Sequence, residues 1–152
     1  MHRRIFIRRL LSTSIAAISG LLHAKQAAAT WPADHFGNGE FSLQFQQLFA
    51  NQTIIDSDEL LLSIPDSAEN GAVVPITISS DLDDIRKIYI WVEKNPTPLA
   101  AEFELNRSAI CYLTARIKMA ESCHVIVLAQ QGQRLLRAQS WVNVMVGGCG
   151  AG

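Results

Sequence analysis

The sequence predicts an all-β protein, an antiparallel β-sandwich with a short helix near its N-terminus and a flexible glycine-rich arm at its C-terminus. Three observations predict this architecture. About seven short runs of β-type residues follow one another, roughly eight to twelve residues apart, with turn signals between them. One segment alone repeats its apolar side chains at helical spacing. The final six residues, GGCGAG (147–152), offer no side chain large enough to join a core.

The first 29 residues have the three-part layout of an export signal. A basic start that contains Arg3 and Arg4 precedes a moderately apolar stretch at 10–22, and three alanines at 27–29 provide small residues for a signal peptidase. The apolar stretch is too short to span a membrane, which takes about 20 residues. The start, RRIFIR, resembles the twin-arginine pattern of bacterial export, which predicts a periplasmic location. The alternative is an amphipathic first helix of the folded domain.

Cleavage after residue 29 would leave 123 of the 152 residues. It would also remove five of the thirteen basic residues, so that eight remain against fourteen acidic ones and the net charge becomes −6. This acidic balance excludes the basic surface that nucleic-acid binding requires. A chain of this length predicts one domain with one core. The expected organisation is a signal peptide at 1–29, a sandwich at 30–146 and an arm at 147–152.

The folded part is expected to begin with a helix. Four apolar residues between Phe41 and Phe49 recur at i, i+4, i+7 and i+8, which places them on one helical face. Asn38 or Gly39 could begin this helix. Seven strands are expected to follow, at 59–65, 72–79, 87–93, 101–105, 109–119, 123–130 and 134–146.

Two of the three cysteines belong to predicted strands. Cys111 alternates with polar residues in its run, and Cys123 begins the apolar run CHVIVLA. The segment MAES between the runs predicts a hairpin turn, which would place Cys111 opposite about Gln130 and Cys123 opposite about Lys118. The two cysteines would then lie several rungs apart, whereas a disulfide needs α-carbons within about 7 Å. The sequence therefore predicts two packed thiols and no disulfide between them.

Cys149 belongs to a different kind of segment, since Gly147, Gly148, Gly150 and Gly152 surround it. Ordering glycine costs more conformational entropy than ordering any other residue, and no side chain here can offset this cost by packing. The sequence therefore predicts an exposed thiol on a flexible arm. A free thiol has a pKa of about 8.5, which leaves a few per cent as thiolate at neutral pH.

The sequence predicts no metal site, no cofactor and no catalytic residue of its own. His2 and His23 fall in the leader, and His35 and His124 are far apart in the sequence. The sequence also contains no C-x-x-C pair. The acidic run DLDDI (81–85) lacks the spacing and the glycine of an EF-hand loop, and predicts a solvated turn. The chain is therefore not expected to be a self-sufficient enzyme.

The arm and several strands together resemble the SoxY family of sulfur-oxidation proteins. That family typically ends in GGCGG, which Gly147, Gly148, Cys149 and Gly150 match and Ala151 does not. Three further stretches look like family motifs in the same order: ENGAVVPITI (69–78), IYIWVEKNPTPLAAEFEL (88–105) and ARIKMAES (115–122).

The resemblance implies an immunoglobulin-like sandwich that pairs with a second small β protein, SoxZ, and acts as a carrier. It implies that Cys149 holds sulfur covalently while partner enzymes process it. A haem protein conjugates thiosulfate to the thiol, a hydrolase releases sulfate, and a sulfur dehydrogenase oxidises the remaining sulfur. An exposed edge strand is the expected contact for the SoxZ-like subunit, with the runs at 72–79 and 134–146 as candidates.

Four alternatives remain open at this point. The chain could be a periplasmic binding module with a disordered tail, or a SoxY-like carrier for another sulfur compound. Cys149 is fourth from the end, as in a prenylated protein, but Gly150 and Ala151 are not the usual aliphatic pair. A thiol–disulfide enzyme would need a resolving cysteine beside Cys149.

Overall fold

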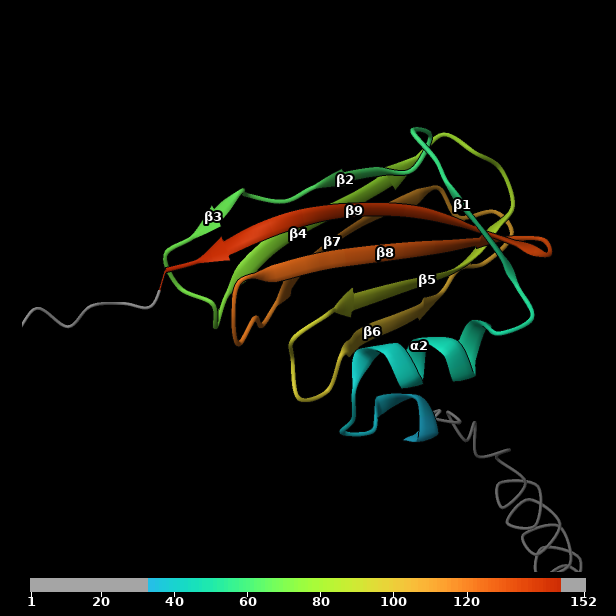
Figure 1. Ribbon diagram of the computed structural model, residues 1–152. Helices are drawn as coiled ribbons and strands as arrows, with labels where there is room; N and C mark the ends of the chain where they lie inside the picture. Colours follow the sequence, from blue (N-terminus) through green and yellow to red (C-terminus); the bar gives the residue numbers. More distant parts are fainter. Residues whose placement is uncertain (1–32, 146–152) are drawn as a thin grey trace, which may run out of the picture. The chain divides into compact units, whose positions relative to one another are not determined.

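The computed structural model describes residues 33–145, and the fold below is that of this part of the chain. Nine strands in the described part form two sheets that face each other, and a helix lies on the outer face of the larger sheet (Figure 1). The predicted all-β sandwich with a short N-terminal helix is confirmed. The strands are β1 (Thr53–Asp56), β2 (Leu61–Ser63), β3 (Ser67–Ala68), β4 (Val74–Ser80), β5 (Ile85–Val92), β6 (Leu99–Glu104), β7 (Cys111–Ile117), β8 (Cys123–Gln131) and β9 (Arg134–Val144).

The larger sheet has the order β1-β9-β8-β5-β6, and the short β3 also pairs with β9. Its central pairs are antiparallel, whereas β1 and β3 run parallel to β9. Strand β8 is buried on both faces: Val125 and Val127 point to the smaller sheet, and Ile126 and Leu128 point to the helix side. This double burial explains why its sequence is a continuous apolar run rather than an alternating one.

The smaller sheet has the order β2-β4-β7 and is antiparallel throughout. Its strands alternate, because one face lies on the core and the other faces solvent. In β4, Val74, Ile76 and Ile78 are buried against the larger sheet, while Pro75 is exposed. The core between the sheets is therefore aliphatic.

A second apolar layer lies outside the larger sheet, under the 3₁₀ turn η1 (Ala33–Phe36) and the helix α2 (Phe41–Phe49). The rings of Phe41, Phe45 and Phe49 lie 5.7, 5.5 and 6.1 Å from the fully buried ring of Trp91. The helix expected from the phenylalanine spacing is therefore confirmed. It does not begin at Asn38 or Gly39 as expected but at Phe41, after Glu40, whose side chain makes no capping hydrogen bond.

The predicted hairpin between the strands at 109–119 and 123–130 is wrong. Strand β7 pairs with β4 in the smaller sheet, whereas β8 pairs with β5 and β9 in the larger one. The segment between them crosses from sheet to sheet, and Met119 within it is buried in the core. Cys111 consequently lies opposite Ser80 rather than Gln130, and Cys123 lies opposite Val142.

The seven predicted strands correspond to β2 and β4–β9, with small shifts of their ends. Two strands were not predicted: β1, of four residues, and β3, of two, which both form by pairing with β9. The run at 72–79 corresponds to β4, the central strand of its sheet, so it is not an edge strand. Strand β9 is flanked by β8 on one side and in part by β1 and β3 on the other.

Candidate functional site

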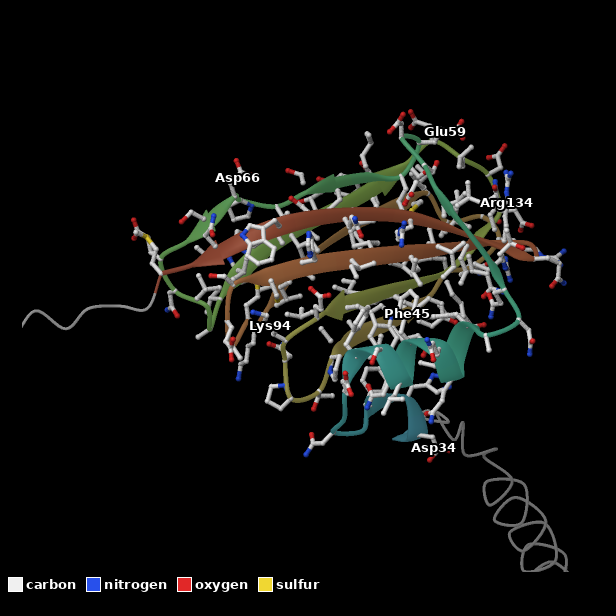
Figure 2. All side chains as sticks on the ribbon, viewed as in Figure 1. Asp34, Phe45, Glu59, Asp66, Lys94 and Arg134 are labelled. Atoms are coloured by element: carbon white, nitrogen blue, oxygen red, sulfur yellow. The ribbon has the colours of Figure 1, made fainter. Side chains whose placement is uncertain are left out.

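The residues predicted to carry the function lie outside the described residues. The structure does describe the end of β9 and Met145, which directly precede the predicted arm and are called the base of the arm below. This end of the sandwich also holds Asp66 and Lys94, while Glu59 and Arg134 mark the opposite end (Figure 2). The predicted site residues that lie outside the described part are Arg3, Arg4, Gly147, Gly148, Cys149, Gly150 and Gly152.

The last residues of β9 are held on both sides. On one side, Asn143 N–H donates to the Asp66 carbonyl oxygen at 2.9 Å, and Met145 N–H donates to that of Ala68 at 2.9 Å. On the other side, Val144 N–H donates to the Ser122 hydroxyl oxygen at 2.8 Å. The base of the arm is therefore fixed to the sandwich up to Met145.

Gly71 closes the space between this strand end and the crossover segment. Its carbonyl oxygen accepts a hydrogen bond from Met119 N–H at 2.7 Å. A Cβ atom added at Gly71 would collide with the Met119 carbonyl oxygen and would lie 2.9 Å from Val144 Cγ1. Only glycine allows the three segments to approach this closely.

Asn95 ties a third loop to the same place. Its side-chain amide donates to the Lys118 carbonyl oxygen at 2.7 Å, and its Oδ1 accepts from Ala120 N–H at 2.9 Å. The stretches ENGAVVP, EKNP and RIKMAES, which are far apart in the sequence, therefore meet at the base of the arm. Sequence reasoning identified these stretches but did not predict that they converge.

An open groove of about 490 Å³ runs between these loops, and most of its lining is apolar. It begins at Gly71, beside Val144, and is therefore adjacent to the base of the arm. Its lining residues are Gly71, Ala72, Asn95, Pro96, Thr97, Lys118, Met119 and Ala120.

Beside the base of the arm, the outer face of the larger sheet presents an exposed aromatic residue. Trp141 is 45% exposed, and its indole N–H donates to Asn143 Oδ1 at 3.0 Å. The His124 ring lies edge-on to Trp141 at 5.0 Å, and His124 Nδ1 lies 3.3 Å from Glu93 Oε2. His124, predicted to stand alone, is therefore part of a surface cluster.

The two described cysteines are not available for chemistry. Cys111 is 3% exposed, Cys123 is fully buried, and both are free thiols. Burial raises the pKa of both thiols, because it disfavours the charged thiolate. The prediction of two packed thiols without a disulfide between them is confirmed.

A part-buried carboxylate lies on the same outer face, nearer the helix. Glu102 Oε2 lies 2.8 Å from His35 Nδ1, and Glu102 Oε1 accepts a hydrogen bond from Lys87 Nζ at 2.9 Å. Burial by itself would raise the pKa of Glu102, but the hydrogen bonds from His35 and Lys87 outweigh it and hold this pKa below its ordinary value. The hydrogen bond to Glu102 in turn raises the pKa of Lys87.

Within residues 33–145, no group of three or more histidine, cysteine or acidic side chains is placed to hold a metal ion. The same part of the chain contains no helix with the length and apolar composition needed to cross a bilayer.

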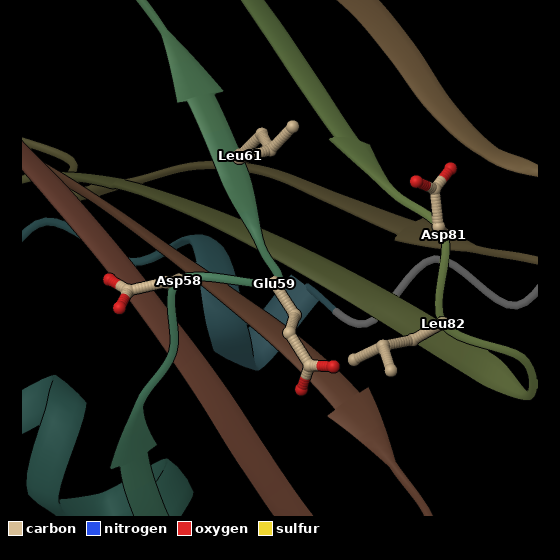
Figure 3. Close-up of a pocket in the computed structure, with 5 residues that line it drawn as sticks. All are labelled: Asp58, Glu59, Leu61, Asp81 and Leu82. Atoms are coloured by element: carbon tan, nitrogen blue, oxygen red, sulfur yellow. The ribbon is translucent and has the colours of Figure 1, made fainter.

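The opposite end of the sandwich has a different character. There, Asp58, Glu59 and Asp81 surround a pocket of about 260 Å³ together with Leu61 and Leu82 (Figure 3). The three carboxylates point in different directions around the pocket (Figure 3). The run DLDDI supplies part of this end, as the predicted turn between β4 and β5.

Comparisons with known proteins identify the family. The model of the family "Sulfur oxidation protein SoxY" matches residues 45–149, which is more than half of the chain and includes Cys149. A solved structure of the sulfur carrier protein SoxY from Chlorobium limicola f thiosulfatophilum is similar, with a TM-score of 0.63 and 27% sequence identity. This match covers 70% of this chain and 97% of that one, and it confirms the immunoglobulin-like sandwich expected from the resemblance.

A superoxide reductase (neelaredoxin) from Ignicoccus hospitalis gives a weaker match, with a TM-score of 0.49 and 15% identity. It covers 57% of this chain and 80% of that one. No curated protein matches the sequence. The family model, which accounts for the arm cysteine as well as the sandwich, gives the assignment: this chain belongs to the SoxY family of sulfur oxidation proteins.

Proposed function

We propose that this protein is the sulfur carrier of a Sox thiosulfate-oxidation system and that it holds sulfur intermediates covalently on Cys149. One observation supports this most strongly. The family match extends to Cys149, while the other two cysteines are buried inside the sandwich. Cys111 and Cys123 are thus inaccessible to a partner enzyme, and Cys149 is the remaining candidate.

The loading step is an oxidation. The Cys149 thiolate and the outer sulfur of thiosulfate form an S–S bond, and the two electrons released pass to the haem protein. The product is a cysteine S-thiosulfonate. A hydrolase then adds water to the terminal sulfonate, which leaves as sulfate with two protons, and a persulfide remains on Cys149. A sulfur dehydrogenase oxidises this remaining sulfur.

Covalent attachment suits such a sequence of steps. The intermediate cannot diffuse away between enzymes, and each reaction becomes effectively intramolecular once carrier and enzyme have docked. From Val146 to Cys149 an extended chain reaches about 10 Å, enough to place the thiol beyond the body of the carrier. The held end of β9 supports this role, because a firm base defines where the arm starts.

The proposal includes partners and a location. The carrier works as a heterodimer with a SoxZ-like subunit, and it meets the haem protein, the hydrolase and the dehydrogenase in the periplasm. The twin-arginine signal around Arg3 and Arg4 exports it as a folded protein. The carrier itself is not an enzyme.

Intact-mass measurement tests the proposal. The protein is purified from the periplasm after the cells have received thiosulfate, and its mass is compared with that of the Cys149→Ser variant. We expect sulfur-containing adducts on the unaltered protein and none on the variant, which retains Cys111 and Cys123 as internal controls. Equal adducts on both proteins, or none on either while thiosulfate is consumed, would refute the proposal. Repeating the experiment with sulfide and sulfite identifies the compound that is loaded.

A further inference from the structure

The two sheets differ in what covers their outer faces. The helix α2 and the turn η1 cover much of the outer face of the larger sheet. No described element covers the outer face of the smaller sheet, where Leu61 is 58% exposed and Tyr112 is 67% exposed. Ile110, directly before β7, is 82% exposed. Large exposed apolar side chains that gather on one face mark a candidate contact surface.

Two cross-strand rows of this outer face, here called the bare face, carry no charge, whereas the next row carries Arg116. The two rows are Leu61, Ser79 and Tyr112, then Ser63, Thr77 and Thr114. Both rows are uncharged, and most of their side chains are small hydroxyls that leave a flat surface around one large aromatic ring. Interface cores are depleted in charge and enriched in tyrosine.

Carboxylates form a rim at one end of the bare face. Asp58, Glu59 and Asp81 surround the pocket beside Leu61 (Figure 3). Asp83 and Asp84 line a larger hollow of about 670 Å³, which Ile110 and the cation Arg107 also line. None of these five carboxylates forms an ion pair with another residue of the described part. Five of the fourteen acidic residues of the chain therefore gather here, and Arg107 is the one cation that lines the same two hollows.

We propose that the bare face docks a partner protein whose contact surface is apolar at its centre and lined with lysine or arginine at its rim. This inference rests on the proposed function, in which the partner is the SoxZ-like subunit. Tyr112, Ile110 and Leu61 form the apolar centre of the contact. The five carboxylates set the orientation of the partner and speed its approach, since unpaired charges of one sign attract a surface of the other sign.

A second copy of this chain fits the bare face less well. A two-fold contact that lays the acidic rim of one copy on the other end of its mate would bring it near Arg116 and Lys118. Two cations cannot balance five carboxylates, and the excess acid would repel. A basic partner therefore suits the charge better than a second copy does.

A partner on the bare face would not cover the base of the arm. The acidic rim lies where β4 ends and β7 begins, whereas the opposite ends of these strands lie near Gly71 and Met119. A partner seated on Leu61, Ile110 and Tyr112 therefore leaves the base of the arm accessible to enzymes. The same protein can hold its partner and present its thiol at the same time.

Calorimetric titration of the purified carrier with the SoxZ-like subunit from the same organism tests this inference. The variant Ile110→Glu/Tyr112→Glu places two charges at the proposed centre, and we expect it to weaken binding by about 100-fold. The control is Leu43→Glu, which alters a side chain that is 57% exposed on α2, and we expect unchanged affinity. The variant Asp81→Asn/Asp83→Asn keeps the shape of the rim, and we expect lower affinity at low salt and a weaker dependence of the affinity on salt.

The outcomes separate the inference from the proposed function. Unchanged binding by the glutamate and asparagine variants overturns the inference, as does binding lost equally in the Leu43→Glu control. A dimer of the unaltered chain that the glutamate variant abolishes overturns it in favour of a second copy. Absence of binding by the unaltered carrier also overturns it. The adducts on Cys149 report on sulfur carriage independently, and remain the test of the proposed function. If the glutamate variant does not fold, the asparagine variant decides the role of the rim.

Discussion

At residue 71 the sandwich has room for glycine alone, because Met119 and Val144 occupy the space that a side chain would need. We expect Gly71→Ala to lower the free energy of unfolding by about 1–3 kcal/mol, the usual cost of forcing a methyl group into a filled site. Urea denaturation measures this loss. Gly37→Ala is the matched control, since its Cβ would meet Gln44 Nε2 at an ordinary 3.6 Å. Equal losses in the two variants would contradict the steric explanation.

Glu102 is expected to make stability depend on pH in the acid range. Its pKa in the folded protein lies below the ordinary value of 4.5, so the folded state holds the proton more weakly than the unfolded state does. Its contribution is therefore present above pH 4.5 and is lost as the pH falls through the folded pKa. We expect Glu102→Gln to flatten the decrease in unfolding free energy below pH 4.5.

Denaturant titrations at several pH values measure this slope. Glu59→Gln is the control, because Glu59 is exposed and forms no ion pair within the described part of the chain. A Glu102→Gln protein with the same acid slope as the unaltered one would show that the contacts with His35 and Lys87 do not stabilise the fold.

Single-residue environments were only partly predictable. The alternation around Cys111 and the apolar run after Cys123 were sufficient to predict two packed thiols, because burial follows from the pattern of neighbours. The cluster of Trp141, His124 and Glu93 was not predictable. His124 lies on β8, Trp141 on β9 and Glu93 just after β5, and only the pairing of β8 with β9 brings His124 beside Trp141.

The helix α2 is the element whose packing can be tested most directly. The side chain of Phe45 points from α2 toward the larger sheet (Figure 2). Its ring lies 5.1, 5.2 and 5.5 Å from the rings of Phe41, Phe49 and Trp91. We expect Phe45→Ala to cost about 2–3 kcal/mol, somewhat less than a fully buried phenylalanine, because Phe45 is only partly buried. Chemical denaturation provides the measurement. Leu43→Ala, on the exposed side of the same helix, should change stability by less than about 0.5 kcal/mol.

The elements themselves were more predictable than their pairing. Local spacing was sufficient for α2 and for seven of the nine strands in the described part, because periodicity depends on neighbours along the chain. Pairing depends on distant residues: MAES has the length of a hairpin turn, yet buried Met119 and its hydrogen bond to Gly71 make it a bridge between sheets. Neither β1 nor β3 exists apart from β9, on whose edge they form.

At the scale of the whole molecule, two thiols are buried in the sandwich and the third is predicted to lie on the arm. In the native protein we expect a chromogenic thiol reagent to modify one cysteine of the three, and all three after unfolding in guanidinium. The rate of the native reaction should rise with pH, with an apparent pKa of about 8.5. No basic residue follows Arg137 in the sequence that could lower the pKa of the thiol. Stopped-flow absorbance measures both quantities. Rapid modification at pH 5 would contradict an unactivated thiol, and two fast native thiols would contradict the burial of Cys111 or Cys123.

The position of β9 within the larger sheet has a mechanical consequence. Any pull on the C-terminus enters the body at Met145 and runs along a strand of eleven residues that is bonded to β8 along its length and to β1 and β3 at its two ends. To extract that strand, a force would have to shear many hydrogen bonds at once rather than unzip them one by one. If a bound enzyme pulled on the C-terminus, the contact with the enzyme would therefore break before the sandwich unfolded.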